Sequence, residues 1–344
     1  MSGKILAIQF KYLGDVAVAT PALRSLKEHC GGAELHVLVP EEAAPLLAHV
    51  RWIDRVWGFP RRRGRMNLRA ALPAVRELRA QCFDVSVDLA GNDRGALLSA
   101  LIRAPKRIGM LAPHGSLWRR ACYTQTVEAL DATRHESVRL WAVVAVLGVP
   151  FPDALRMQLA PDPALLAQAR AYLDRVEVLC FINAGQPKRE WPLSHWAEFH
   201  AMASAHGVVV GFSGGNTARE RSLLRQLRER IPQATVLEPV EPLPALLAAL
   251  AQLKGFISAD TGPMHFAAAL GVPTIGLFGP TSAQCWAPLG DQHHWLQGTP
   301  CPCSGHAHAC EARKPCIAAI TPRQLYAAFL RMIGQEAGAA SPRP

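Results

Sequence analysis

The chain has 344 residues, of which 50% are hydrophobic and 19% charged, and this balance argues against a disordered protein. No apolar run is long enough to cross a bilayer, and the chain starts without a signal-peptide pattern, so we expect a cytoplasmic protein. The formal net charge of +10 fits an acidic partner: nucleic acid, an anionic membrane surface, or a phosphorylated or carboxylated substrate. A proteome that uses arginine freely explains the same charge.

The first half of the chain predicts strands that alternate with helices. The predicted strands cover residues 4–10, 34–39, 55–59 and 85–89, and later helices cover 42–49, 68–81 and 94–102. The first helix is predicted to begin at Thr20 and Pro21, which fit an N-cap and a first helical residue, or a turn earlier after Asp15. Such alternation is typical of a parallel sheet in an α/β domain.

The loop after the first predicted strand carries Gly14 and Asp15. Ligands of parallel sheets bind at the carboxyl ends of the strands, so this loop is a candidate site. A carboxylate there suits a general base for a substrate hydroxyl, and it also suits a helix cap. The loop lacks the G-x-G-x-x-G pattern of dinucleotide-binding oxidoreductases, which argues against that class of enzyme.

Two further features of the first half concern anion binding. Arg61 and Arg63 belong to a dense basic loop, and Arg94 follows the strand that ends near Asp88. Arginine binds carboxylates and phosphates, so the loop suits an anionic ligand or a membrane surface, unless it is simply a solvated loop. The chain shows no helix-turn-helix, zinc-finger or basic-aromatic motif, so we expect no nucleic-acid partner.

Proline-rich residues 147–163 predict a connection between two domains. Beyond it, strands are predicted over 178–182, 208–212, 256–258 and 274–278. Helices are predicted over 165–173, 218–230 and 243–253, and from Thr321 to 333. The second half therefore repeats the strand and helix alternation of the first.

Three loops of the second half have the composition of a nucleotide site. Lys188 and Arg189 follow a turn of small residues and suit a phosphate, although an exposed turn would look similar. Gly214 and Gly215 allow close approach of a ligand to the backbone. Glu220, in the next helix, could accept hydrogen bonds from a ribose, or be a helix-surface residue beside Arg221.

The stretch from Asp260 to His265 predicts the start of a helix immediately after a strand. The free N–H groups at Thr261 and Gly262 suit an anion, and Gly271 is predicted to end the helix. An ordinary turn with a capping aspartate and a packed histidine is the alternative. Because strand-end loops of one sheet converge, we expect these residues to share one ligand with Lys188 and Arg189.

Four cysteines cluster late in the chain: Cys301, Cys303, Cys310 and Cys316. Their spacing departs from the paired C-x-x-C of structural zinc sites. We expect no catalytic metal, and a structural metal stays open.

Three strings of the sequence together resemble the motifs of the lipopolysaccharide core heptosyltransferases, glycosyltransferase family 9. They are residues 5–16 with 20–27, residues 183–192, and residues 260–281. In that family the aspartate at the place of Asp15 is the proposed catalytic base. A lysine commonly lies two residues before a Trp-Pro pair and binds the donor diphosphate; here Arg189 stands at that place and Lys188 precedes it, so either can make the contact.

The resemblance implies the GT-B architecture, two Rossmann-like α/β domains with parallel sheets facing across a cleft. It implies an acceptor domain over residues 1–160, a nucleotide-sugar domain over 161–322, a terminal helix over 323–334 packing back toward the first domain, and a disordered tail over 335–344. Gly14, Arg61, Arg63 and Arg94 would then serve the acceptor, and Lys188, Arg189, Glu220, Asp260, Thr261, Gly262 and His265 the donor.

The implied reaction is inverting transfer of a heptose from ADP-heptose to the inner core of lipopolysaccharide, without a cofactor. The partners would be ADP-heptose and an anionic lipopolysaccharide precursor at the cytoplasmic face of the inner membrane. A non-catalytic paralogue that binds the sugar nucleotide, or another nucleotide-dependent Rossmann enzyme, is the alternative. The sequence leaves open which core heptose is added, with the first strand and the Gln186 loop closer to the branching enzyme.

Overall fold

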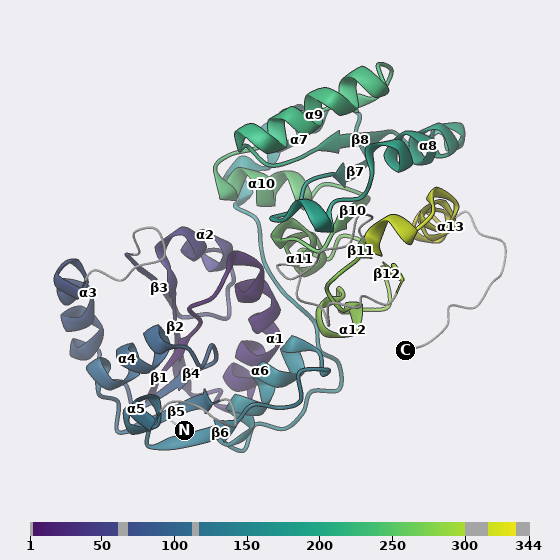
Figure 1. The fold of residues 1–344 in the computed structure, drawn as a ribbon. Helices are drawn as coiled ribbons and strands as arrows, with labels where there is room; N and C mark the ends of the chain where they lie inside the picture. The colour runs from purple at the N-terminus through teal and green to yellow at the C-terminus, as the bar shows by residue number, and fades with distance from the viewer. Residues whose placement is uncertain (1–2, 61–67, 112–116, 300–315, 335–344) are drawn as a thin grey trace. The chain divides into compact units, whose positions relative to one another are not determined.

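A computed structural model describes residues 3–60, 68–111, 117–299 and 316–334 (Figure 1). The contacts divide the chain into two units, Met1–Ala160 and Pro161–Pro344. Among the described residues, each unit contains a six-stranded sheet in which every paired strand is parallel to its neighbour. Arg61, Arg63, Cys301, Cys303, Cys310 and the tail over 335–344 lie outside the described residues.

The elements of the first unit follow the predicted alternation. Its strands are β1 (Gly3–Ile8), β2 (Ala33–Pro40), β3 (Arg55–Phe59), β4 (Val85–Asp88), β5 (Lys106–Leu111) and β6 (Gln125–Glu128). Its helices are α1 (Leu13–His29), the 3-10 turn η1 (Glu41–Ala43), α2 (Ala44–Leu47), α3 (Leu68–Ala80), α4 (Asp93–Ile102), α5 (Leu117–Cys122) and α6 (Glu136–Ala145). Helices α1 and α6 pack side by side, and α4 packs against both α3 and α5 (Figure 1).

The second unit repeats this plan. Its strands are β7 (Val178–Phe181), β8 (Val210–Ser213), β9 (Thr235–Val236), β10 (Gly255–Ala259), β11 (Thr274–Phe278) and β12 (His294–Gln297). Its helices are α7 (Leu166–Leu173), α8 (Leu193–Ala203), α9 (Ala218–Arg230), α10 (Leu243–Leu250), α11 (Gly262–Ala269), α12 (Ala283–Trp286) and α13 (Pro322–Met332), with 3-10 turns η2 (Pro163–Leu165), η3 (Pro187–Arg189), η4 (Ser204–His206) and η6 (Cys316–Ala319).

Both sheets have the same strand order, which fixes where a ligand can bind. The order is β3-β2-β1-β4-β5-β6 in the first unit and β9-β8-β7-β10-β11-β12 in the second. In each sheet the chain winds outward from a central pair, β1 with β4 and β7 with β10. The loops after such a pair run in opposite directions and leave a crevice at the carboxyl edge of the sheet.

Helix α1 begins earlier than the sequence predicted. Its N-cap is Tyr12, so Thr20 and Pro21 lie inside the helix and not at its start. Pro21 has no N–H to donate to the carbonyl of Ala17, four residues before it. The Thr20 hydroxyl donates to that carbonyl at 2.6 Å, which explains how the helix continues through the proline.

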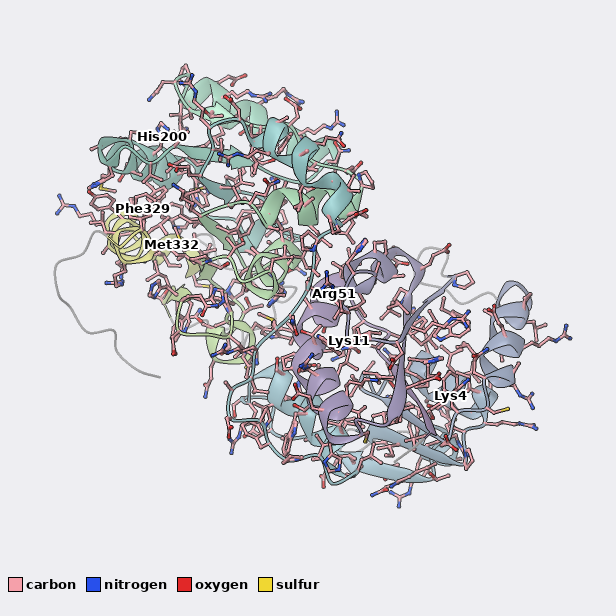
Figure 2. The ribbon with its side chains drawn as sticks, turned by 180° about the vertical axis from the view of Figure 1, so that it is seen from behind. Lys4, Lys11, Arg51, His200, Phe329 and Met332 are labelled. Carbon is pink, nitrogen blue, oxygen red and sulfur yellow. The ribbon has the colours of Figure 1, made fainter. Side chains whose placement is uncertain are left out.

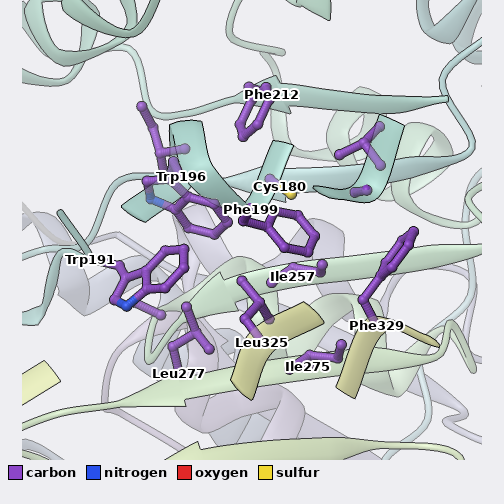
Figure 3. Close-up of a cluster of buried hydrophobic side chains, with 14 of the residues drawn as sticks. Cys180, Trp191, Trp196, Phe199, Phe212, Ile257, Ile275, Leu277, Leu325 and Phe329 are labelled. Atoms are coloured by element: carbon purple, nitrogen blue, oxygen red, sulfur yellow. The ribbon is translucent and has the colours of Figure 1, made fainter. Parts of the chain in front are cut away.

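The core of the second unit is built around aromatic residues (Figure 3). Trp191 packs edge-on against Trp196 with ring centroids 4.8 Å apart, and its Nε1–H donates to the Ile320 carbonyl. Phe329 of α13 packs edge-on against Phe199 of α8 at 5.6 Å. The apolar face of α13 thus completes the core of the second unit.

None of the helices in the described part of the chain combines the length and the apolar character that crossing a bilayer requires.

We predict that Phe329→Ala lowers the free energy of unfolding of the second unit by about 3–5 kcal/mol, because a fully buried ring leaves a cavity in the core. Arg323→Ala, on the exposed side of the same helix, should change it by less than about 0.5 kcal/mol. Urea denaturation checks both values. Equal stability of the two variants would mean that α13 does not belong to this core.

Candidate functional site

Asp15 lies at the crevice of the first unit, in the first turn of the helix that follows β1. The residue is 8% exposed, and its Oδ2 accepts a hydrogen bond from the Tyr12 backbone N–H at 3.3 Å. Lys11, labelled in Figure 2, lies in the loop between β1 and α1. Its Nζ is 3.9 Å from Asp15 Oδ1. Gly14 directly precedes Asp15 in the helix, so both residues lie where the sequence placed a ligand.

The surroundings of Asp15 change its acidity. Burial raises its pKa to about 6, and the nearby Glu136 carboxylate raises it as well, against the opposing effects of Lys11 and of the Tyr12 N–H. A carboxyl group with a pKa near neutrality accepts a proton far better than an ordinary aspartate. The environment therefore suits a general base.

Glu136 forms the second half of this charged group. It is the first residue of α6, and its side chain is 1% exposed. Lys11 Nζ lies 2.7 Å from Glu136 Oε1, and Arg139 Nη1 lies 2.5 Å from Glu136 Oε2. The sequence analysis missed Lys11, Glu136 and Arg139, because 125 residues separate Lys11 from Glu136 and no short motif joins them.

The loop after β4 holds the other side of the crevice. Asp88 is fully buried and accepts hydrogen bonds from the Tyr123 hydroxyl at 2.6 Å and from the Ala90 N–H at 3.0 Å. Its pKa is raised to about 6, mainly by burial. Asn92 Nδ2 donates to the Phe10 carbonyl at 2.7 Å and so ties this loop to the loop that carries Lys11.

Arg94 is the second residue of α4, the helix after this loop. Its backbone N–H and that of Gly95 donate to Asn92 Oδ1, which caps α4. The side chain of Arg94 is partly buried. Arg94 and Asp15 thus follow the two central strands of the same sheet.

The second unit brings together most of its predicted residues at the corresponding crevice. Arg189 Nη1 lies 3.2 Å from Asp260 Oδ2, and His265 Nε2 lies 3.8 Å from Asp260 Oδ1. Thr261 is the N-cap of α11 and Gly262 its first residue, as predicted. These residues come from the loops after β7 and β10, the central pair of the sheet.

Two more predictions for the second unit concern Lys188 and the end of α11. Lys188 belongs to the same 3-10 turn as Arg189 and is partly buried. Gly271, at φ +80°, follows Leu270, the C-cap of α11, which agrees with the prediction that it ends the helix.

Glu220 takes part in the cap of helix α9. Its Oε2 accepts hydrogen bonds from the Thr217 N–H at 3.0 Å and from the Thr217 hydroxyl at 2.6 Å, which forms a capping box. The contact with a ribose stays a prediction. The sequence pattern T-x-x-E at 217–220 was the signal for this cap.

Asn183, at the end of β7, is a buried residue that the sequence analysis did not single out. Its Oδ1 accepts a hydrogen bond from the Gly215 N–H at 3.0 Å. A Cβ on Gly214 would overlap that oxygen, so the glycine is needed for the approach of the two loops. The pair of glycines thus serves packing between β7 and β8.

A cavity of about 230 Å³ opens at the ends of β7, β8 and β9. Its walls are mostly apolar and include Phe181, Leu243 and the backbone of Gly215. Asn216 Nδ2 donates to Glu241 Oε2 at 2.8 Å, and both residues line the cavity. Apolar walls with a few polar groups suit a flat heterocycle.

Within the described residues, no group of three or more His, Cys, Asp and Glu side chains is arranged to hold a metal ion. Cys316 is partly buried, and the other three cysteines of the late cluster lie outside those residues.

Comparison with known proteins decides the family. The family description "Glycosyltransferase family 9 (heptosyltransferase)" matches residues 72–315, which is more than half of the chain. The chain belongs to glycosyltransferase family 9.

Two heptosyltransferases are similar to this chain over most of its length. Lipopolysaccharide heptosyltransferase 3 of Escherichia coli is 27% identical over 291 residues, 81% of this chain and 84% of that protein. Lipopolysaccharide heptosyltransferase 1 of Pseudomonas aeruginosa is 29% identical over 322 residues, 87% of this chain and 86% of that protein. This glycosyltransferase is thus similar along most of its length to enzymes named for heptose transfer.

Solved structures show the same fold. A family 9 glycosyltransferase from Veillonella parvula matches with a TM-score of 0.82 at 22% identity, over 97% of this chain and 98% of that one. The Escherichia coli heptosyltransferase WaaC, solved with ADP, matches with a TM-score of 0.75 at 21% identity, over 96% of this chain and 99% of that one. The two parallel sheets of this glycosyltransferase are those of the GT-B architecture.

We predict that Asp15→Asn stabilises the enzyme at pH 8. The pKa of Asp15 is about 6 in the folded state, above the ordinary value of 3.8, so the ionised carboxylate opposes folding. This effect amounts to about 3 kcal/mol above pH 6 and vanishes when the pH is well below 4. The uncharged amide of the variant removes this opposition, so its gain in urea midpoint over wild type should disappear as the pH falls from 8 to 4. Asp153→Asn, on an exposed residue, is the control. A wild type that is as stable as Asp15→Asn at pH 8 would contradict the burial of a charged carboxylate.

Proposed function

We propose that this enzyme transfers a heptose from ADP-heptose to a hydroxyl of the lipopolysaccharide inner core, with Asp15 as the general base. The single observation that supports it most is a buried aspartate whose pKa is raised to about 6, at the carboxyl edge of a parallel sheet. The names of the relatives and the ADP bound to a structure of the same fold support the donor and the acceptor.

In this mechanism Asp15 accepts the proton of the acceptor hydroxyl as its oxygen attacks the anomeric carbon. The bond between that carbon and the diphosphate oxygen breaks, and ADP departs with the electron pair. Attack from the side opposite to ADP inverts the anomeric centre. Asp15 is ionised above a pH of about 6, so the base is ready in neutral solution.

The charge that grows on the departing ADP requires positive groups in the second domain. Arg189 and Lys188 supply two cations, and the N–H groups at the start of α11, at Thr261 and Gly262, supply partial positive charge. Asp260 holds the Arg189 guanidinium at this helix start. These groups offer the neutralisation that other transferases obtain from a metal ion, so we propose a reaction without a catalytic metal.

The remaining parts of the substrates have candidate positions as well. The apolar cavity beside Gly215 suits the adenine ring, with Glu220 acting indirectly through the cap of α9. Gly14 and Arg94 suit the acceptor, and the basic loop with Arg61 and Arg63 keeps that role as a proposal. A lipid-linked acceptor would place the reaction at the cytoplasmic face of the inner membrane.

A non-catalytic paralogue would bind ADP-heptose without turnover. The pKa of Asp15 favours the enzyme, because a binding protein gains nothing from a buried carboxylate that opposes folding. The relatives include heptosyltransferases named 1 and 3, so their names do not decide which heptose of the core is added. A panel of acceptors decides it.

We predict that Asp15→Asn lowers kcat/KM for heptose transfer by about 10²- to 10⁴-fold at pH 8, the usual contribution of a general base. The assay supplies ADP-heptose and a panel of truncated core acceptors, and mass spectrometry detects the gain of one heptose. Asp153→Asn, an exposed residue, should transfer as wild type does. Full activity of the Asp15 variant would exclude Asp15 as the base, and no transfer to any acceptor by wild type would exclude the proposed reaction.

We predict that Arg189→Gln weakens ADP binding by about 10-fold or more, because a charge-assisted hydrogen bond contributes about 1.5–3 kcal/mol. Calorimetry on the full chain measures this, with Lys188→Gln beside it to show which cation contacts the diphosphate. Arg175→Gln, exposed just before β7 and so at the other edge of the sheet, is the control for the loss of charge. Unchanged affinity in both Arg189→Gln and Lys188→Gln would remove this turn from the donor site.

A further inference from the structure

The ammonium group of Lys11 lies among three carboxylates of the first domain. Its Nζ is 2.7 Å from Glu136 Oε1 and 3.9 Å from Asp15 Oδ1. The positive charge of Lys11 also lowers the pKa of the buried Asp88 carboxyl group. The short contact is to Glu136, so the ammonium is bonded there and only approaches Asp15.

Glu136 is held firmly enough to keep Lys11 in this place. Its carboxylate is almost fully buried, and each of its two oxygens has a cationic partner, Lys11 on one and Arg139 on the other. Helix α6 is itself fixed to α1, because the Ser137 hydroxyl donates to the Val18 carbonyl at 2.9 Å. The position of the carboxylate is therefore set by the fold.

We propose that Glu136 is a positioning residue for the transfer reaction: it holds the Lys11 ammonium away from Asp15 and so leaves the Asp15 carboxylate free to receive the proton of the acceptor. This inference rests on the proposed function, in which Asp15 is the base. Glu136 acts through Lys11 and touches no substrate.

The Lys11 ammonium group has two carboxylates to choose between, Glu136 and Asp15. With Glu136 present, Lys11 binds a fully buried carboxylate and leaves Asp15 at 3.9 Å. Without that carboxylate, Asp15 is the nearest remaining anion, and a direct ion pair would form there. An opposite charge in contact lowers the pKa of a carboxyl group by about 1–3 units, and the ammonium would occupy the lone pairs that the acceptor hydroxyl needs.

The other groups around Asp15 agree in sign with this argument. Lys11 and the Tyr12 N–H lower its pKa, whereas burial and the Glu136 charge raise it. Arg139 lies beyond Glu136, and Asp88 faces Lys11 from the loop after β4. Removing the Glu136 charge takes away one effect that raises the pKa of Asp15 and leaves the attraction of Lys11, so the pKa of Asp15 falls.

The test is the pH dependence of kcat/KM for heptose transfer in wild type, Glu136→Gln and Lys11→Met. Wild type should lose activity in acid with an apparent pKa near 6. In Glu136→Gln this pKa should fall by about 1–3 units and the plateau above it should drop, since a weaker base transfers protons less well. In Lys11→Met the apparent pKa should rise, because the attracting charge is gone.

A matched control removes the same charge elsewhere. Glu28 lies on α1, as Asp15 does, and forms an exposed ion pair with Arg24. It is 13 residues from Asp15 along the helix, which corresponds to roughly 20 Å. The control variant is Glu28→Gln. Its profile should coincide with that of wild type. Thermal unfolding of each variant shows whether it is folded, and if Glu136→Gln does not fold, Lys11→Met alone decides.

Opposite shifts of the apparent pKa in Glu136→Gln and Lys11→Met support the inference. A purely structural role of Glu136 would instead lower kcat/KM equally at every pH. An acid limb that stays near 6 in both variants would overturn it. Asp15→Asn, measured in parallel, separates this failure from that of the proposed function. If Asp15→Asn is inactive and the limb does not move, only the role of Glu136 is wrong, whereas an active Asp15→Asn removes the base itself.

Discussion

The winding of each sheet in two directions from a central pair of strands is the constraint on which both sites depend. Crossover helices cover the faces of a parallel sheet, but at the central pair the loops diverge and their ends stay accessible. The loops after β1 and β4 carry Asp15 and Arg94, and the loops after β7 and β10 carry Arg189 and Asp260. The same strand order thus positions the proposed base in one domain and the proposed anion site in the other.

Burial then gives these residues their chemistry. Asp15 has lost most of its contact with water, and the Lys11 ammonium near it is bonded to another carboxylate, so its pKa lies near neutrality. Arg189 lies beside the start of a helix, where an anion finds both a guanidinium group and backbone N–H groups. Inverting transfer has two requirements. One is a raised pKa for the group that takes the proton, and the other is a fixed positive site for the leaving group.

Much of this followed from the sequence, because the signals were local. Helix α9 and strands β3 and β11 have the predicted bounds, and the cap, first residue and end of α11 were predicted from Thr261, Gly262 and Gly271. Two missed contacts are local, each spanning three residues: the Thr20 hydroxyl bonds the Ala17 carbonyl where α1 passes through Pro21, and Glu220 forms a capping box with Thr217. The contact of Glu136 with Lys11 spans 125 residues, and no propensity or short motif reports contacts of that range.

The central claim is that the ionisation of Asp15 controls transfer, and the most direct measurement is the titration of its side-chain carboxyl carbon by NMR in enzyme labelled with ¹³C at aspartate. Asp15→Asn identifies the resonance by its loss. The account predicts a pKa of about 6 for Asp15 that coincides with the acid limb of kcat/KM. A pKa near the ordinary 3.8, or an acid limb that does not follow the titration of Asp15, would contradict it.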